Sequence, residues 1–132
     1  MSDDPCPFCR RIAAGDMGAR NESAVAFPDA FPVSPGHTLV VPLRHAADLF
    51  DLDIAERRGV WDLVDVVRDA LVADLAPDGF NVGVNVGVAA GQTVPHAHVH
   101  LIPRFAGDVE DPRGGVRWVI PAAAAYWNQR TE

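Results

Sequence analysis

Apolar residues recur at helical spacing in the middle of the chain. Between residues 52 and 75 they lie three or four positions apart, at Val60, Val64, Val67, Leu71 and Leu75. This spacing places side chains on one face of an α-helix. Asp51 or Asp53 can cap its first turn, and the segment 76–79, which contains proline and glycine, ends it. A shorter helix is predicted for residues 7–14.

Residues 80–88 alternate between apolar and small or polar side chains. The apolar set is Phe80, Val82, Val84, Val86 and Val88, and the other set is Asn81, Gly83, Asn85 and Gly87. A period of two predicts a strand with one buried face. The small residues leave room for a ligand on the other face, although an ordinary solvent-facing strand has the same pattern.

Further strands are predicted at residues 23–27, 37–41, 96–102 and 116–120. A proline-rich loop separates the first two of these, and a polar, turn-rich segment separates the last two. Short connections and one long helix favour an α+β fold with an antiparallel sheet of about five strands and a short N-terminal helix.

Three histidines alternate with apolar residues in the predicted strand at residues 96–102. His96, His98 and His100 are therefore predicted to share one face, with neighbours about 6.6 Å apart. Imidazole acts as a nucleophile, a general acid or base, a phosphate donor or a metal ligand. A single histidine needs no special explanation, but three in one strand do. A three-histidine zinc site is the main alternative to phosphate chemistry.

The residues around the histidines favour phosphate over metal. No acidic side chain lies between residues 79 and 101. Just before the histidines, a turn offers backbone N–H groups, an amide and a hydroxyl from Gly91, Gln92, Thr93 and Val94. Donor-rich turns of this kind bind anions.

Composition narrows the function further. The 132 residues fit one domain, and a net charge of −7 argues against non-specific binding to nucleic acid or to an anionic membrane. All 11 basic residues are arginines, which excludes a phosphate-binding or Schiff-base lysine. No apolar run reaches the roughly 20 residues of a membrane span. The acidic start lacks the apolar region of a signal peptide, so we expect a cytoplasmic protein.

The two cysteines, Cys6 and Cys9, form one C-x-x-C motif. A disulfide is disfavoured in a cytoplasmic chain, and a thioredoxin-like context for redox chemistry is absent. A structural zinc site remains, but it needs two more ligands.

Residues 96–102 (HAHVHLI) match the signature of the histidine triad (HIT) superfamily. Further segments resemble landmarks of that family in the expected order, over about residues 6–108: 8–12 (FCRRI), 33–42 (VSPGHTLVVP), 91–95 (GQTVP) and 103–108 (PRFAGD). The segment 114–127 resembles a bacterial subgroup related to the fragile-histidine-triad branch. The resemblance implies a single HIT domain over residues 1–132, with a tail at about 109–132.

The resemblance also implies nucleotide chemistry at an α-phosphate through a covalent nucleotidyl-histidine. By position, His98 is the nucleophile, and His96, His100 and His37 surround the phosphate or fix the imidazole. Asp29 matches the ribose contact. The remaining nucleotide-binding positions comprise an apolar base pocket at Phe8, Ile12 and Phe27, which ordinary core packing would also explain, and phosphate contacts at Asn85 and in the turn at Gly91, Gln92, Thr93 and Val94. The chemistry itself needs no metal.

Bacterial members of the family also imply the two missing zinc ligands, His45 and His96. If His96 holds zinc, it is structural and cannot serve as a proton donor. The expected activity is hydrolysis of dinucleoside polyphosphates or nucleoside phosphoramidates with a purine nucleotide as substrate. A nucleotidyltransferase or phosphorylase, or a binding module with vestigial turnover, is the alternative. A homodimer with a sheet continued across its interface is implied, and we expect the helical apolar stripe beside Trp61 to contribute to it.

Overall fold

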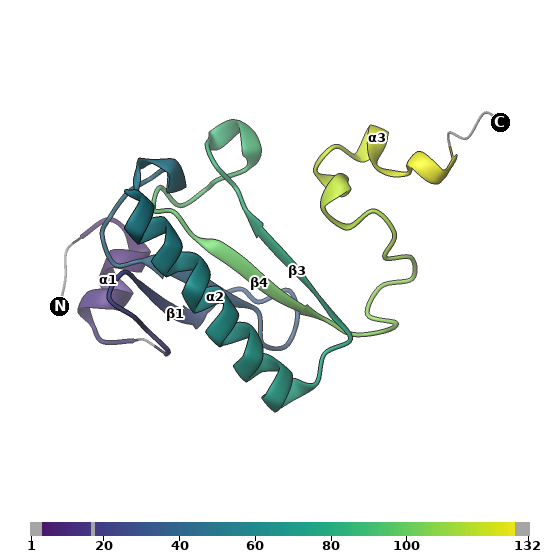
Figure 1. Cartoon of the computed structure of the whole chain (residues 1–132). Helices are drawn as coiled ribbons and strands as arrows, with labels where there is room; N and C mark the ends of the chain where they lie inside the picture. Colours follow the sequence, from purple (N-terminus) through teal and green to yellow (C-terminus); the bar gives the residue numbers. More distant parts are fainter. Residues whose placement is uncertain (1–3, 17, 129–132) are drawn as a thin grey trace.

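The computed structural model describes residues 4–16 and 18–128, and its elements form an α+β fold (Figure 1). The helices are α1 (Pro7–Ala13), α2 (Ile54–Leu75) and α3 (Pro121–Ala124), and the strands are β1 (Ala24–Pro28), β2 (Thr38–Pro42), β3 (Gly79–Val84) and β4 (Val99–Arg104). The strands make one antiparallel sheet in the order β1-β2-β4-β3. None of the described helices combines the length and apolar character needed to cross a membrane.

Helix α2 begins two residues later than its apolar pattern predicts. Asp53 is its N-cap: the Asp53 side chain accepts from the backbone N–H of Glu56, and the Glu56 carboxylate accepts from that of Asp53, at 2.7 and 3.1 Å. This reciprocal pair satisfies two N–H groups that the first turn leaves open. The helix ends before Ala76, which takes a left-handed conformation with φ of 46°.

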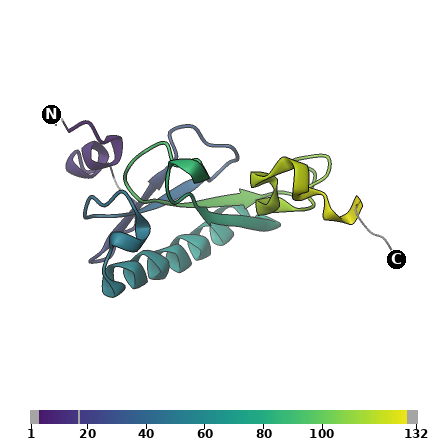
Figure 2. The same ribbon diagram turned by 90° about the horizontal axis from the view of Figure 1, so that it is seen from above.

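The residues of the two hydrophobic cores alternate along the strands and so lie on opposite faces of the sheet. Figure 2 shows α2 against one face and α1 beyond the other. The apolar stripe of α2 packs on one face, through Val60, Leu63, Val64 and Val67. Helix α1 covers β1 and β2 on the other face, where Phe8 packs with Phe27 and Leu39. The expectation that the α2 stripe contributes to a dimer interface is therefore wrong, because its own sheet buries it.

One row of residues crosses the second face of the sheet. Phe27 of β1 pairs with Leu39 of β2, Leu39 with His100 of β4, and His100 with Gly83 of β3. A side chain built on Gly83 would meet nothing within 4 Å. The face beside His100 is thus open, as the small residues of this strand predict.

Two predicted strands are shorter than their patterns suggest. β3 ends at Val84 instead of residue 88, because the chain turns through Gly87 with φ of 90° into a short 3₁₀ helix at Val88–Ala90. β4 begins only at Val99, so His100 is the one histidine of the triad inside a strand. His96 and His98 precede it, in a segment where the Ala97 N–H bonds to the Ala46 carbonyl beyond β2.

The fifth predicted strand, at residues 116–120, is a 3₁₀ helix at Gly115–Val119, so the described part of the chain has four strands in its sheet. Gly114 and Gly115 have positive φ angles of 98° and 50°, which turn the chain away from an extended conformation at the start of this segment. The Trp118 indole donates to the Arg113 carbonyl at 2.8 Å and closes the turn. Residues 129–132 of the predicted tail lie outside the described residues.

The tail from residue 109 to 128 projects from the body of the molecule beyond β3 (Figure 1). It is held mainly by its own contacts, such as Arg117 to the Ala123 and Ala124 carbonyls, at 2.7 and 3.0 Å. Its apolar side chains are largely solvent-exposed, including Val116, Trp118, Val119, Ile120 and Tyr126. Exposed apolar surface of this kind is a candidate for contact with a partner.

Candidate active site and metal-binding cluster

His98 is buried one residue before β4, with its Nδ1 atom 2.8 Å from the backbone carbonyl of His96. A carbonyl only accepts hydrogen bonds, so Nδ1 carries the proton and Nε2 of the neutral ring keeps its lone pair. The ring lies edge-on to Phe8 and to His100, with centroids 5.0 Å apart in both cases. The Nε2 lone pair of His98 is therefore free, as a nucleophile would require.

His37 and His100 form a second oriented pair. The backbone N–H of Val33 donates to His37 Nδ1 at 3.1 Å, so the neutral ring carries its proton on Nε2. That proton faces His100 Nδ1 at 3.0 Å, which leaves the His100 proton on Nε2. The result is a donor next to His98, suited to a phosphoryl oxygen.

Burial keeps this pair neutral near pH 7. It lowers the pKa of both His37 and His100, and the neighbouring histidines lower the pKa of His100 further. Asp29 opposes the effect, with its Oδ2 atom 3.4 Å from His37 Nε2 and 3.9 Å from His100 Nδ1. Burial likewise lowers the pKa of His96, whose ring is fully enclosed.

These shifts predict a stability that falls in mild acid. A histidine whose pKa is lower in the folded than in the unfolded chain binds fewer protons when folded, so its contribution is complete above about pH 6.5 and is lost as pH falls below that value. We expect the melting temperature to drop between pH 7.5 and 5.5. The drop should be smaller in His37→Asn, measured by circular dichroism. Equal drops in the two proteins would contradict the expectation, since both keep the same remaining histidines.

The loop between β3 and β4 carries the predicted anion-binding turn. Gln92 braces it: its amide oxygen accepts from Gly87 N–H at 2.8 Å, and its amide nitrogen donates to the Ala47 and Val94 carbonyls at 2.7 and 3.0 Å. The Gln92 side chain thus makes its hydrogen bonds to the backbone of this loop and of the segment after β2. The backbone N–H groups of Thr93 and Val94 have no acceptor in the described part of the chain, so both donors are available to a ligand.

The predicted base pocket is more enclosed than the sequence suggests. Phe8 and Phe27 are buried, 7% and 1% exposed, with ring centroids 5.6 Å apart, while Ile12 is half-buried against the same cluster. The guanidinium of Arg11 lies over the Phe27 ring, 3.9 Å from its centroid. Sequence reasoning missed Arg11, although it lies three residues after Phe8 and so on the same helical face.

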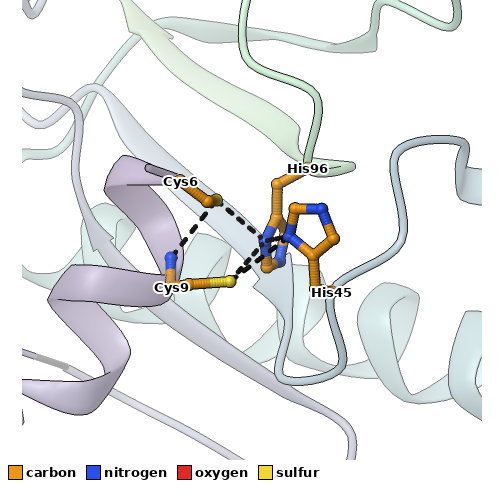
Figure 3. Close-up of side chains that lie close together, drawn as sticks. All are labelled: Cys6, Cys9, His45 and His96. Atoms are coloured by element: carbon orange, nitrogen blue, oxygen red, sulfur yellow. Dashed lines mark hydrogen bonds between the residues drawn. The ribbon is translucent and has the colours of Figure 1, made fainter. Parts of the chain in front are cut away.

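Four side chains converge near the end of β2 and the start of β4: Cys6, Cys9, His45 and His96 (Figure 3). Sulfur-to-nitrogen distances are 3.4 Å from Cys6 to His96, 3.3 Å from Cys9 to His45 and 3.5 Å from Cys9 to His96. The Nδ1 atoms of the two histidines lie 3.2 Å apart. Tetrahedral zinc bonds put such ligand atoms roughly 3.3–3.6 Å apart. The cluster therefore has donor atoms spaced closely enough to hold a metal ion.

The surroundings of His96 suit a metal ligand. Its Nε2 atom is 2.8 Å from the Pro42 carbonyl, so Nε2 carries the proton and Nδ1 turns a lone pair toward the cysteines. Both cysteines are free thiols. Burial and the neighbouring Cys6 raise the pKa of the Cys9 thiol to about 11 in the absence of a metal. The ring of His96 thus belongs to the cluster, while its carbonyl belongs to the site of His98.

Comparison with known proteins gives a consistent result. The sequence model of the HIT domain family matches residues 15–107. An uncharacterized HIT-like protein of Mycoplasma genitalium is 41% identical over 104 residues, covering 76% of this chain and 73% of that protein. A bis(5'-nucleosyl)-tetraphosphatase (asymmetrical) of Schizosaccharomyces pombe is 38% identical, covering 70% of this chain and 50% of that protein. An AP-4-A phosphorylase of Mycobacterium tuberculosis is 36% identical, covering 71% and 49%.

Solved structures agree with these matches. A HIT family protein from Bacillus anthracis superposes with a TM-score of 0.72 at 31% identity, covering 98% of this chain and 100% of that one. A zinc-bound histidine triad family protein from Mycobacterium smegmatis superposes with a TM-score of 0.70 at 31% identity, covering 96% and 98%.

Proposed function

The chain belongs to the HIT domain family, and on this premise we propose that it is a nucleotide hydrolase acting at an α-phosphate through a covalent nucleotidyl-histidine. The observation that carries the proposal is the hydrogen bond from His98 Nδ1 to the His96 carbonyl, because it leaves Nε2 free to attack phosphorus. A relative named as a tetraphosphatase and another named as a phosphorylase support nucleotide chemistry of this class.

The proposed reaction has two displacements. His98 Nε2 bonds to the α-phosphorus while the bond to the leaving group breaks, and the leaving group takes a proton from solvent. Water then attacks the same phosphorus and gives a proton back to solvent, the P–N bond breaks, and the nucleotide is released with the His98 ring restored. The N–H groups of Thr93 and Val94 and the Nε2–H of His100 serve to stabilise charge on the phosphoryl oxygens. Asn85 is a further candidate phosphate contact, and Asp29 is the candidate for the ribose hydroxyls.

One assay separates this function from its alternatives. Rates on diadenosine polyphosphates and on adenosine phosphoramidates are measured side by side, with and without inorganic phosphate. Hydrolysis independent of phosphate supports the proposal. Turnover that requires phosphate, with a nucleoside diphosphate as product, indicates a phosphorylase instead. AMP binding without turnover of any substrate identifies a binding module.

We further propose that the ion held by Cys6, Cys9, His45 and His96 is zinc. Tetrahedral spacing, the mixed thiol and imidazole ligands and a zinc-bound relative support this choice. Four protein ligands would complete a tetrahedral zinc shell, so we propose a structural role. A cytoplasmic location fits the free thiols that such a site requires. We treat residues 1–132 as a single domain.

The chain is expected to form a homodimer through the free edge of β3 and the adjoining apolar tail. Light scattering should give twice the chain mass of 14.2 kDa at micromolar concentration. Ile120→Asp, which places a charge on this exposed surface, should shift the population toward monomer. Val33→Asp, at an equally exposed apolar residue in the β1–β2 loop, should not. A wild-type monomer would contradict the expectation.

A further inference from the structure

The guanidinium of Arg11 fills the space over Phe27 that an apolar pocket would leave for the nucleobase. The central carbon of this guanidinium lies over the Phe27 ring, 3.9 Å from the ring centroid. Phe8 packs against the same ring, at 5.6 Å between centroids, and Phe27 is left only 1% exposed. A nucleobase cannot reach Phe27 unless Arg11 moves away.

The guanidinium is fixed in this position by two hydrogen bonds. Nε donates to Asp16 Oδ2 at 2.9 Å, and Nη1 donates to the Pro28 carbonyl at 2.8 Å. The Arg11 side chain nevertheless keeps 23% of its surface exposed. An arginine that rests on an aromatic ring and keeps part of its surface exposed can offer the other face of its guanidinium, and bases stack on guanidinium planes.

The position of Arg11 matches the end of a bound nucleotide. Phe27 and His100 belong to one row across three strands, two strand spacings or about 10 Å apart. Asp29, the candidate ribose contact, is one residue beyond the Pro28 carbonyl that Arg11 binds. His98, Asp29 and Arg11 therefore follow the order of phosphate, ribose and base.

We propose that Arg11 is the base-binding residue of this protein, and that the nucleobase stacks on the outer face of its guanidinium. This inference rests on the proposed nucleotide site. Because a purine covers more of the guanidinium than a pyrimidine, the platform favours purine nucleotides. Ile12 and Phe8 then line the edge of the base and Phe27 supports the platform from below.

The test compares ligands with and without a base. Calorimetric titration with AMP and with ribose 5-phosphate is carried out on wild type, Arg11→Ala and Arg11→Lys, each checked for folding by circular dichroism. Arg11→Ala should bind AMP about 5- to 100-fold more weakly and ribose 5-phosphate unchanged. Arg11→Lys keeps the charge but loses the plane, so it should lose most of the AMP affinity too. Arg11→Lys also gives a result if the alanine variant does not fold.

Arg10→Ala is the matched control, since Arg10 lies on the same helix, is exposed and carries the same charge. It should bind both ligands as wild type does. If Arg11→Ala weakens the binding of AMP and of ribose 5-phosphate equally, Arg11 only supports the structure of the site, and the inference is overturned. Unchanged AMP binding would overturn it as well. A wild-type protein that binds neither ligand would instead contradict the proposed function itself.

Discussion

His98→Asn is expected to lower turnover of a nucleoside phosphoramidate by several orders of magnitude. Asparagine keeps a planar, polar side chain but has no ring nitrogen to bond phosphorus, and removing one member of a catalytic group commonly has an effect of this size. AMP affinity should change much less, because Arg11, Asp29 and the loop N–H groups remain. Stopped assays with purified protein measure the first effect, and calorimetric titration measures the second.

Trapping the intermediate gives the sharper control. Acid-quench mass spectrometry with a slow phosphoramidate substrate should map a nucleotidyl adduct to His98 in the wild type. His100→Ala should react more slowly but still form the adduct, since it removes a donor and leaves the nucleophile. An adduct on another residue, or normal turnover by His98→Asn, would overturn the proposed mechanism.

Removal of both cysteines is expected to produce the largest loss of stability. Cys6→Ala/Cys9→Ala should purify without zinc and melt about 10 °C or more below the wild type, because binding to a preformed site contributes directly to folding free energy. Helix α1 should be affected most, since both thiols anchor it to the His45 loop and to the segment before β4. Metal analysis and thermal melts measure these effects.

The remaining activity of the double variant tests whether the metal is only structural. Below its melting transition, its turnover per folded molecule should stay within a few-fold of the wild type. Arg10→Ala on the same helix should keep both zinc and melting temperature. Full zinc occupancy in the double cysteine variant would refute the ligand assignment, and loss of all turnover in its folded state would refute a structural role.

The parts of the fold that the sequence predicted well are those where local signals agree. Helix α2 has apolar spacing, a capping pair and a stop, and it forms as expected apart from its first two residues. The strand predicted for residues 80–88 is too long. Its apolar residues continue past Val84, while the positive φ of Gly87 ends the extended chain. At residues 116–120 the valines and tryptophan suggest a strand, but two glycines fold them into a 3₁₀ turn without a partner strand.

The candidate site depends more on tertiary placement. The sequence motif and the segments around it identify the histidines. The orientation of each ring depends on hydrogen bonds to backbone groups in loops, such as the Val33 N–H that bonds to His37. Arg11 was missed because a charged residue on a short amphipathic helix is normally solvent-exposed. Its contact with Phe27 depends on how α1 packs against β1, and helical spacing alone could only mark the shared face.

His96 connects the two sites through opposite ends of one residue. The imidazole faces the cysteines, while the backbone carbonyl sets the proton of the His98 ring. A protein engineer could therefore treat the two tasks separately, since any residue that keeps the backbone path supplies the same carbonyl. Replacing the four ligands together by close-packing apolar side chains would give a protein that needs no metal. Apolar packing, instead of metal–ligand bonds, would then hold the segment that carries His98 in place.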